Sequence, residues 1–389
     1  MKKHRLAWLG AIAAAAIAMT GCSASASGED AAQAAGGEPI VIGVSGPLTG
    51  NQAEYGKNWQ EGIDIALDEI NGAGGVNGRP IEIDFQDSQG QASQATTIAQ
   101  RFVSDDKILA VLGDFSSATS MVASPLYQRG GLLQLGITNS HPDFTKTGDF
   151  IFSPSITQEE DARELADGAH TFGSKIAVIN LNTDWGISAR DIFTDQVKKN
   201  GDELVYQADV EEASTDFKPQ LVQLREAKPD VVVFFTYYST TSLLVQQAKQ
   251  AGIPDDVIYV AVGSNYSAEF LDLAGDAAEG VYLNTSFTTE SDDEKVTSFV
   301  SAFDKKYGYQ PNLFAAYAYD GVKQIAWAAE HAKTVDRAGI RDALRDADAI
   351  PSIIYGEASY DENRRAKNPV FKWLEVQDGA FVPTEVTGH

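Results

Sequence analysis

The stretch Ile40-Val41-Ile42-Gly43-Val44 opens the folded part of this sequence and indicates its structural class. The run is apolar throughout and mostly β-branched, which is typical of a strand covered on both faces of a sheet. A helix is predicted to follow at 59–70, because apolar residues recur there every three or four positions. A glycine-rich stretch at 71–80 then turns the chain and ends this first strand-helix unit.

The same alternation of strand and helix continues along the chain in two series. The first series has predicted strands at 81–85, 108–112 and 132–135, and helices at 91–104 and 119–128. The second has predicted strands at 175–180, 204–208, 231–235, 257–260 and 281–283, and helices at 159–171, 186–199, 217–225 and 241–250. Predicted helices at 294–306, 313–332 and 338–346 could complete either series. This pattern predicts an α/β fold with two doubly wound parallel-sheet units.

The composition is that of an acidic globular protein. The chain has 55 Asp and Glu against 30 Lys and Arg, a formal net charge of −25. Nucleic acids and anionic lipid headgroups are bound through clusters of Lys and Arg, so we expect neither as a partner. The histidines beyond residue 22 are not paired at metal-ligand spacing, and we expect no metal and no cofactor. They are His141, His170, His331 and His389.

Residues 1–22 read as the signal peptide of a lipoprotein. Positive residues at 2–5 precede an apolar run at 6–18 that is short for a membrane span. Met19-Thr20-Gly21-Cys22 resembles the bacterial lipobox, in which the cysteine takes a diacylglycerol group. Residues 23–38 are small or acidic and predict a flexible tether. We therefore expect a protein anchored by lipid at Cys22, on the extracytoplasmic side of the cell membrane. The alternative is a signal cleaved elsewhere, with Cys22 unmodified.

Two patterns that suggest enzymatic chemistry do not hold. Residues 50–58 resemble a phosphate-binding loop, but five residues instead of four separate the glycines, and Asn58 stands where Ser or Thr would hold magnesium. The nucleophile elbow Gly-x-Ser-x-Gly does not occur in the sequence. His141, in the loop at 138–142, is expected to be a surface histidine and not a general base. We expect no enzyme and no catalytic residue.

The sequence offers one candidate anion site. Ser116 and Ser117 follow the predicted strand at 108–112 and precede a helix, and helix N-termini bind carboxylates through free N–H groups and the helix dipole. The alternative is an ordinary N-cap. Tyr55, Trp185 and Tyr237 each follow a strand and open a helix, so they predict either an aromatic-lined cleft or surface packing.

A set of short motifs spread over residues 39–389 resembles the type I periplasmic binding proteins of branched-chain amino acid ABC transporters. The motifs are residues 42–50 (IGVSGPLTG), 55–56 (YG), 70–78 (INGAGGVNG), 113–117 (GDFSS), 184–186 (DWG), Phe217 and 316–320 (AYAYD). The resemblance implies two lobes joined by three crossovers that close around a ligand. It implies an N-terminal lobe of 39–155 plus 285–355 and a C-terminal lobe of 156–284 plus 356–389.

The resemblance also implies ligand contacts. Ser117, beside Ser116, matches the serine that holds the ligand carboxylate, Thr138 the residue whose carbonyl faces the α-ammonium, and Ser140 a hydroxyl two residues on. Tyr55 and Tyr237 match cleft aromatics, and Trp185 replaces a tyrosine.

One loop departs from the family pattern. Amino-acid binders often place an acidic residue after the strand matched by 257–260, but here the loop at Gly263 reads VGSN. A buried ammonium without a counter-charge is costly. Either Asp184 or Glu160 supplies the charge, or the ligand lacks an amino group.

Together these features predict a lipid-anchored solute-binding protein of an ABC importer. Its expected ligand is a small carboxylate, above all a branched-chain or related amino acid, bound between the lobes. The expected partners are this ligand and an ABC permease with its ATPase, and the protein is expected to be a monomer. The alternatives are a binder of aromatic or aliphatic carboxylates or small amides, a ligand sensor for a membrane receptor and, less favoured, a hydrolase.

Overall fold

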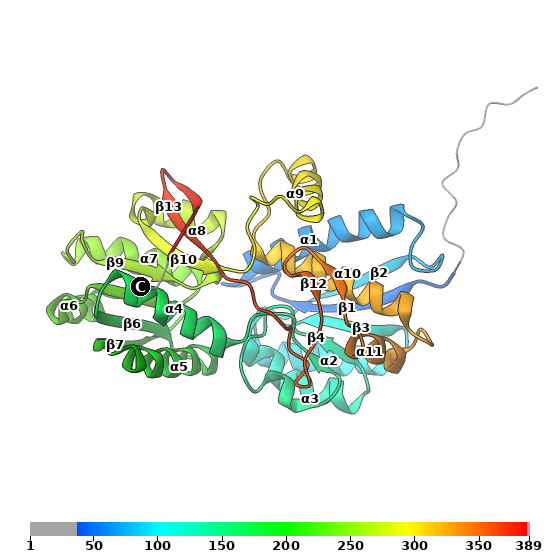
Figure 1. Cartoon of the computed structure of the whole chain (residues 1–389). Helices are drawn as coiled ribbons and strands as arrows, with labels where there is room; N and C mark the ends of the chain where they lie inside the picture. The colour runs from blue at the N-terminus through cyan, green and yellow to red at the C-terminus, as the bar shows by residue number, and fades with distance from the viewer. Residues whose placement is uncertain (1–36, 387–389) are drawn as a thin grey trace, which may run out of the picture. The chain divides into compact units, whose positions relative to one another are not determined.

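The computed structural model describes residues 37–386, which form two α/β lobes (Figure 1). We call the lobe built on the five-stranded sheet lobe 1 and the lobe built on the seven-stranded sheet lobe 2. Helices cover both faces of each sheet, as the apolar strands require. This architecture confirms the predicted α/β class with two doubly wound units.

Lobe 1 has the strand order β2-β1-β3-β4-β5, and all neighbouring strands are parallel. The apolar stretch at 40–44 lies in β1, between β2 and β3, and is buried apart from Val41. The elements of the first pass are β1 (Ile40–Gly46), α1 (Ala53–Gly72), β2 (Ile81–Asp87), α2 (Ala92–Ser104), β3 (Ile108–Gly113), α3 (Ser117–Arg129), β4 (Leu133–Leu135), η1 (Phe144–Thr147) and β5 (Ile151–Phe152). Later in the chain come α9 (Glu294–Tyr307), α10 (Leu313–His331), α11 (Arg337–Arg345), β11 (Ile350–Ser352) and β12 (Gly356–Ala358).

Lobe 2 has the strand order β14-β13-β10-β9-β8-β6-β7. The strands from β7 to β10 are parallel, whereas β13 and β14 run antiparallel at one edge. Its elements are α4 (Gln158–Phe172), β6 (Lys175–Leu181), α5 (Asp184–Asn200), β7 (Glu203–Val210), α6 (Lys218–Ala227), β8 (Val231–Phe235), α7 (Tyr238–Gln250), β9 (Ile258–Ala261), η2 (Gly263–Asn265), α8 (Ala268–Ala274), η3 (Gly275–Ala278), β10 (Val281–Thr285), β13 (Lys372–Gln377) and β14 (Ala380–Thr384). The antiparallel edge was not predicted.

The chain passes between the lobes three times: after β5, after β10 and before β13. The third passage comes later than the expected boundary at 356. Tyr360 still packs on Phe152 of lobe 1, with ring centroids 5.2 Å apart. Arg365 donates a hydrogen bond to the Asn139 carbonyl of the same lobe at 2.7 Å. Residues 356–366 therefore belong with lobe 1, together with β11 and β12.

Helix α1 packs closely against α10, and this packing positions the residues at the start of α1. A side chain at Gly62 would place its Cβ 2.1 Å from the Ala315 carbonyl oxygen, so only glycine allows this approach. The neighbouring turns of α1 bury Tyr55 and Trp59 in the core. The sheets and helices thus bring the carboxyl ends of the strands of both lobes to one place, where ligands of open α/β sheets bind.

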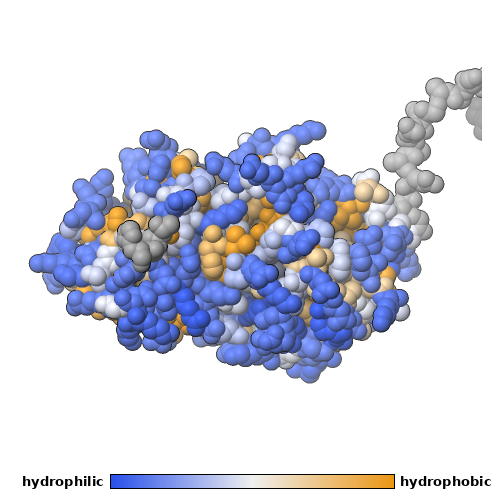
Figure 2. All heavy atoms as spheres, in the orientation of Figure 1, coloured by the Kyte–Doolittle hydropathy of each residue, from blue (hydrophilic) through white to orange (hydrophobic). Residues whose placement is uncertain are grey.

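The outer surface in the view of Figure 2 is largely hydrophilic, as the charge of the chain implies. None of the helices between residues 37 and 386 is long and apolar enough to span a bilayer. Cys22 and the predicted signal peptide at 1–22 lie outside the described residues, as does most of the predicted tether at 23–38.

Candidate functional site

The start of helix α3 presents free hydrogen-bond donors. Ser116 is the N-cap, and its Oγ accepts a hydrogen bond from the Thr119 N–H at 3.1 Å. Ser117 is the first helical residue, and its Oγ accepts from the backbone N–H of His141 at 3.3 Å. No described residue accepts a hydrogen bond from the Ser117 hydroxyl, so its hydrogen is free to donate. The Ser117 and Ala118 N–H groups donate to no other described residue, as expected for the first turn of a helix. This helix end is therefore suited to an anion.

An aromatic floor lies beside this helix end. Phe115 stacks on Tyr55, with ring centroids 4.1 Å apart. Tyr55 itself is 1% exposed and lies behind Phe115, where its hydroxyl donates to the Ser264 carbonyl at 3.2 Å. The Tyr55 oxygen also accepts from the Tyr238 N–H at 3.4 Å. Tyr55 therefore supports the floor and connects α1 of lobe 1 to lobe 2.

The loop after β4 contributes a second polar edge. The Thr138 hydroxyl donates a hydrogen bond to the Phe115 carbonyl at 2.7 Å, so its hydrogen already has an acceptor within the protein. The Ser140 Oγ accepts from the indole Nε1 of Trp185, at the start of α5 in lobe 2, at 3.2 Å. Trp185 stacks on Tyr237, with centroids 5.4 Å apart and planes 17° apart. The two aromatic rings of lobe 2 thus reach the polar loop of lobe 1.

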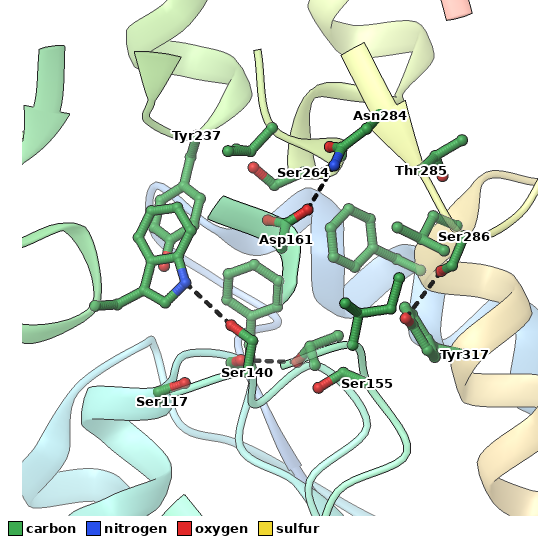
Figure 3. Close-up of a pocket in the computed structure, with 18 of the residues that line it drawn as sticks. Ser117, Ser140, Ser155, Asp161, Tyr237, Ser264, Asn284, Thr285, Ser286 and Tyr317 are labelled. Atoms are coloured by element: carbon green, nitrogen blue, oxygen red, sulfur yellow. Dashed lines mark hydrogen bonds between the residues drawn. The ribbon is translucent and has the colours of Figure 1, made fainter. Parts of the chain in front are cut away.

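The facing wall of lobe 2 carries a carboxylate and an amide. Asn284, at the end of β10, donates from Nδ2 to Oδ1 of Asp161 in the first turn of α4 at 2.7 Å (Figure 3). Burial raises the pKa of Asp161 to about 6, although the hydrogen bond from Asn284 acts in the opposite direction. The Oδ1 of Asn284 is buried and has no hydrogen-bond partner among the described residues. This wall offers acceptors, whereas the start of α3 offers donors.

These elements enclose a cavity of about 110 Å³ between the lobes. Since a buried water needs roughly 10–15 Å³ measured in the same way, the cavity has room for a small organic molecule. Asp161 is the only charged residue among its described lining, and the rest is aromatic, aliphatic or neutral polar. The lining residues are Phe115, Ser116, Ser117, Thr138, Ser140, Ser155, Ile156, Asp161, Trp185, Tyr237, Val262, Gly263, Ser264, Asn284, Thr285, Ser286, Leu313, Phe314, Tyr317 and Phe371.

Most of the residues predicted from the sequence come together in this cavity. The predicted residues that line it are Ser116, Ser117, Thr138, Ser140, Trp185, Tyr237 and Gly263. Tyr55 lies behind the floor, and Asp184 is exposed outside the cavity at the start of α5. Glu160, the other expected counter-charge, does not line the cavity, because its carboxylate accepts from the Thr157 N–H and hydroxyl in the capping box of α4. Contact of these residues with a ligand remains a prediction.

Asp161 and Asn284 were not predicted from the sequence, although both positions carry a signal. Asp161 lies in the stripe of α4 that also contains Gln158, Ala162 and Leu165, which recur at the helical period and face inward. Asn284 directly follows the predicted strand at 281–283, at the carboxyl end where ligands gather. Glu160, one of the two counter-charges expected from the sequence, directly precedes Asp161.

The geometry favours binding over nucleophilic catalysis. Ser117 Oγ contacts the backbone N–H of His141 and not its ring. The ring Nδ1 of His141 instead accepts from the Asp143 N–H at 3.1 Å. Burial lowers the pKa of His141. Among residues 37–386, no group of three His, Cys, Asp or Glu side chains is placed to hold a metal ion.

Two carboxyl groups from different lobes act on one another electrostatically: that of Glu269 in α8 of lobe 2 and that of Glu54 in α1 of lobe 1. Burial raises the pKa of Glu269 to about 7, and the neighbouring Glu54 carboxyl group adds to the rise, while Lys57 opposes it. The ordinary pKa of glutamate is about 4.3, so between about pH 4.3 and 7 the folded protein holds a proton that the unfolded chain has lost. The stability that this proton contributes is present below about pH 4.3 and is lost as the pH rises through 7.

We therefore expect Glu269→Gln to reduce the fall in melting temperature between pH 5 and pH 8, because glutamine cannot ionise. The measurement is the melting temperature at several pH values for the wild type, Glu269→Gln and the control Glu330→Gln, which changes an exposed residue of α10. A pH profile of Glu269→Gln identical to that of the wild type would contradict the raised pKa of Glu269.

Comparison with known proteins matches this chain, over most of its length, to one family of binding proteins. A family model described as periplasmic binding protein matches residues 39–380. The Leu/Ile/Val-binding protein homolog 1 of Brucella abortus is 28% identical over 349 residues, covering 88% of this chain and 92% of the relative. The leucine-, isoleucine-, valine-, threonine- and alanine-binding protein of Pseudomonas aeruginosa is 28% identical over 346 residues, covering 86% and 90%.

The solved structures extend this likeness to the fold. The branched-chain amino acid transporter substrate-binding protein LivJ of Streptococcus pneumoniae, crystallised with isoleucine, has a TM-score of 0.82 and 25% identity. The match covers 89% of this chain and 100% of that chain.

Proposed function

Because this chain belongs to the periplasmic binding protein family, we propose that it is the substrate-binding protein of an ABC importer. Its ligand is a small carboxylate-bearing molecule, a branched-chain or related amino acid, held in the cavity between the lobes. The relatives named for binding leucine, isoleucine and valine support this ligand class. So does LivJ, which was crystallised with isoleucine.

The observation that carries the proposal is the donor set at the start of α3. The Ser117 hydroxyl hydrogen and the N–H groups of Ser117 and Ala118 are unused, and the helix dipole adds positive potential at the same place. Ser117 is only 3% exposed, so a ligand carboxylate bound here would lose its hydrating water and be held by fixed hydrogen-bond donors of the protein. Hydrogen bonds to a charged group are stronger than those between neutral groups.

The aromatic walls account for the rest of the ligand. Phe115, Trp185, Tyr237 and Phe314 line the cavity beside the donors, and an apolar side chain buried among them loses its contact with water. A micromolar affinity corresponds to about −8 kcal/mol. One buried side chain contributes about 1.5–3 kcal/mol, and each hydrogen bond to a charged group contributes a similar amount. The sum over the carboxylate contacts and one apolar side chain must exceed this affinity by the free-energy cost of association.

A thermal-shift screen tests this function. Ligands that bind only the folded protein raise its melting temperature with concentration. The panel contains the twenty amino acids, their amides, and the matching carboxylic acids without an amino group, together with benzoate. We expect leucine, isoleucine or valine to give a concentration-dependent rise. A panel in which no carboxylate raises the melting temperature would contradict the proposal.

A second ligand class remains open within the same function. The loop at Gly263 has no carboxylate, and the lining is rich in aromatic rings, which also suits aromatic carboxylates. The benzoate arm of the screen separates this class from amino acids.

The proposed location is the extracytoplasmic face of the cell membrane, with Cys22 carrying the lipid. Stable anchoring takes two lipid signals, which a diacylglycerol group with its two chains provides. We expect the mature wild-type protein to begin at Cys22 with added lipid mass, and Cys22→Ala to remain unlipidated. Mass spectrometry of the N-terminal peptide makes this measurement, and an unlipidated wild-type N-terminus would contradict the anchor.

A further inference from the structure

The lobe 2 wall of the cavity has two hydrogen-bond acceptor atoms to which no described side chain donates. Asp161 accepts one hydrogen bond, from Asn284 Nδ2 into Oδ1, and no described side chain donates to its Oδ2. The amide orientation of Asn284 follows from this contact, since only its NH₂ group can donate to a carboxylate. Asn284 Oδ1 is then left as an acceptor without a partner, on a side chain that is 1% exposed. Figure 3 shows the two side chains meeting at the cavity wall.

This wall also lacks a counter-charge. Within residues 37–386, no Lys, Arg or His comes within salt-bridge distance of Asp161, and the like charge of Glu164 raises its pKa further. A buried carboxylate without a partner is costly. A buried amide oxygen without a donor adds a further cost of about 1–3 kcal/mol. Both costs disappear if a positively charged N–H donor occupies the space between the two acceptors.

The two acidic residues expected from the sequence to act as counter-charges do not face the cavity. Glu160 is held by Thr157 in the capping box, and Asp184 is exposed outside the cavity. Asp161 lies in the first turn of α4, where the helix dipole stabilises a negative charge. The donors of lobe 1 and the acceptors of lobe 2 therefore lie on facing walls of one cavity.

We propose that Asp161 and Asn284 form the binding site for a protonated amino group of the ligand. This inference rests on the proposed function and narrows it: the ligand is a zwitterion whose carboxylate lies at Ser117 and whose ammonium group lies between Asp161 and Asn284. The ammonium donates to the Asp161 carboxylate and to Asn284 Oδ1. A ligand without the amino group leaves both acceptors unpaired in a closed cavity.

Matched pairs of ligands that differ only in the amino group test the inference. The pairs are leucine with 4-methylpentanoate, phenylalanine with 3-phenylpropanoate, and alanine with propanoate. Calorimetric titration of the wild-type protein at pH 7.5 should show the amino member of a binding pair about 10- to 150-fold tighter, the range for a hydrogen bond to a charged group. Equal affinity of the two members would overturn the inference, while binding of the carboxylates would leave the proposed function intact.

The variant Asp161→Asn keeps the shape of the side chain and removes its charge. It should abolish most of the preference for the amino member and change the affinity of the amino-free member by less than about threefold. Glu160→Gln, one residue away but held in the capping box, is the matched control and should keep the preference. Equal weakening of both members in Asp161→Asn would overturn the inference. If no member of any pair binds the wild type, the proposed function fails and the inference falls with it.

The wild type also supplies a test that does not depend on the folding of a variant. An ammonium ligand favours the ionised form of Asp161, so the affinity for the amino member should fall as the pH drops below about 6, the pKa to which burial raises this carboxyl group. Glu164 in α4 and Tyr317 in α10 are the other titratable groups that interact electrostatically with Asp161. Between about pH 7 and pH 5.5, where a simple carboxyl group stays ionised, the affinity of the amino-free member should not fall. Parallel pH profiles for the two members would count against the site.

Discussion

Ser117→Asp is expected to weaken ligand binding by more than the 10- to 150-fold expected for Ser117→Ala. The alanine variant removes one hydroxyl donor to a charged group, about 1.5–3 kcal/mol, but keeps the backbone N–H groups of α3. The aspartate variant adds a carboxylate that faces the ligand carboxylate inside a closed cavity. Like charges in such surroundings repel strongly. The measurement is calorimetric titration with the ligand found in the screen.

The controls separate loss of binding from loss of folding. Ser117→Asn has the size of the aspartate variant without its charge and should bind more tightly than Ser117→Asp. All three variants should melt near the wild-type temperature, because Ser116 and not Ser117 is the N-cap of α3 and Asp is favourable in the first turn. If Ser117→Asp binds as tightly as the wild type, the carboxylate does not lie at this helix end.

Trp185→Ala should have the second large effect, about 30- to 1,000-fold weaker binding. Trp185 forms an aromatic wall of the cavity, stacks on Tyr237 and donates to Ser140 across the two lobes. Its removal opens the cavity to water and leaves Ser140 Oγ without its donor. Truncation of a central aromatic residue of a binding site costs about 2–4 kcal/mol.

Two further tryptophan variants show whether the loss of ligand affinity arises at the cavity. Trp185→Phe keeps an aromatic ring but loses the indole N–H, and it should fall between the wild type and Trp185→Ala. Trp327→Ala removes a tryptophan that stacks on His331 in α10, away from the cavity, and should leave the affinity unchanged. An affinity loss in Trp327→Ala equal to that in Trp185→Ala would mean that both act through general destabilisation.

The parallel parts of the fold were predictable because their strands are buried on both faces. The runs at 40–44 and 231–235 are apolar without interruption and became β1 and β8. The antiparallel hairpin of β13 and β14 was not predictable in the same way. Its strands are short and lie at an edge. β13 mixes Lys, Glu and Gln with apolar residues, and β14 contains Pro383, so the pattern is weak. The lobe boundary at 356 was also too early, because nothing in the sequence indicated that Tyr360 packs on Phe152.

The donor side of the site followed from the sequence, whereas the acceptor side did not. Ser117 stands at a strand-to-helix junction, a local feature that a single chain reveals. The pairing of Asp161 with Asn284 joins residues 123 positions apart, and only the fold brings them together. The helical period of α4 distinguishes Asp161 from Glu160, but the capping box that engages Glu160 is a matter of side-chain geometry.

A crystal structure of the protein with the ligand found in the screen tests the central claim most directly. The account predicts one small molecule in the cavity between the lobes, with its carboxylate at Ser117 and the start of α3, and its amino group between Asp161 and Asn284. Ligand density outside this cavity, or a ligand whose carboxylate lies against lobe 2, would contradict it.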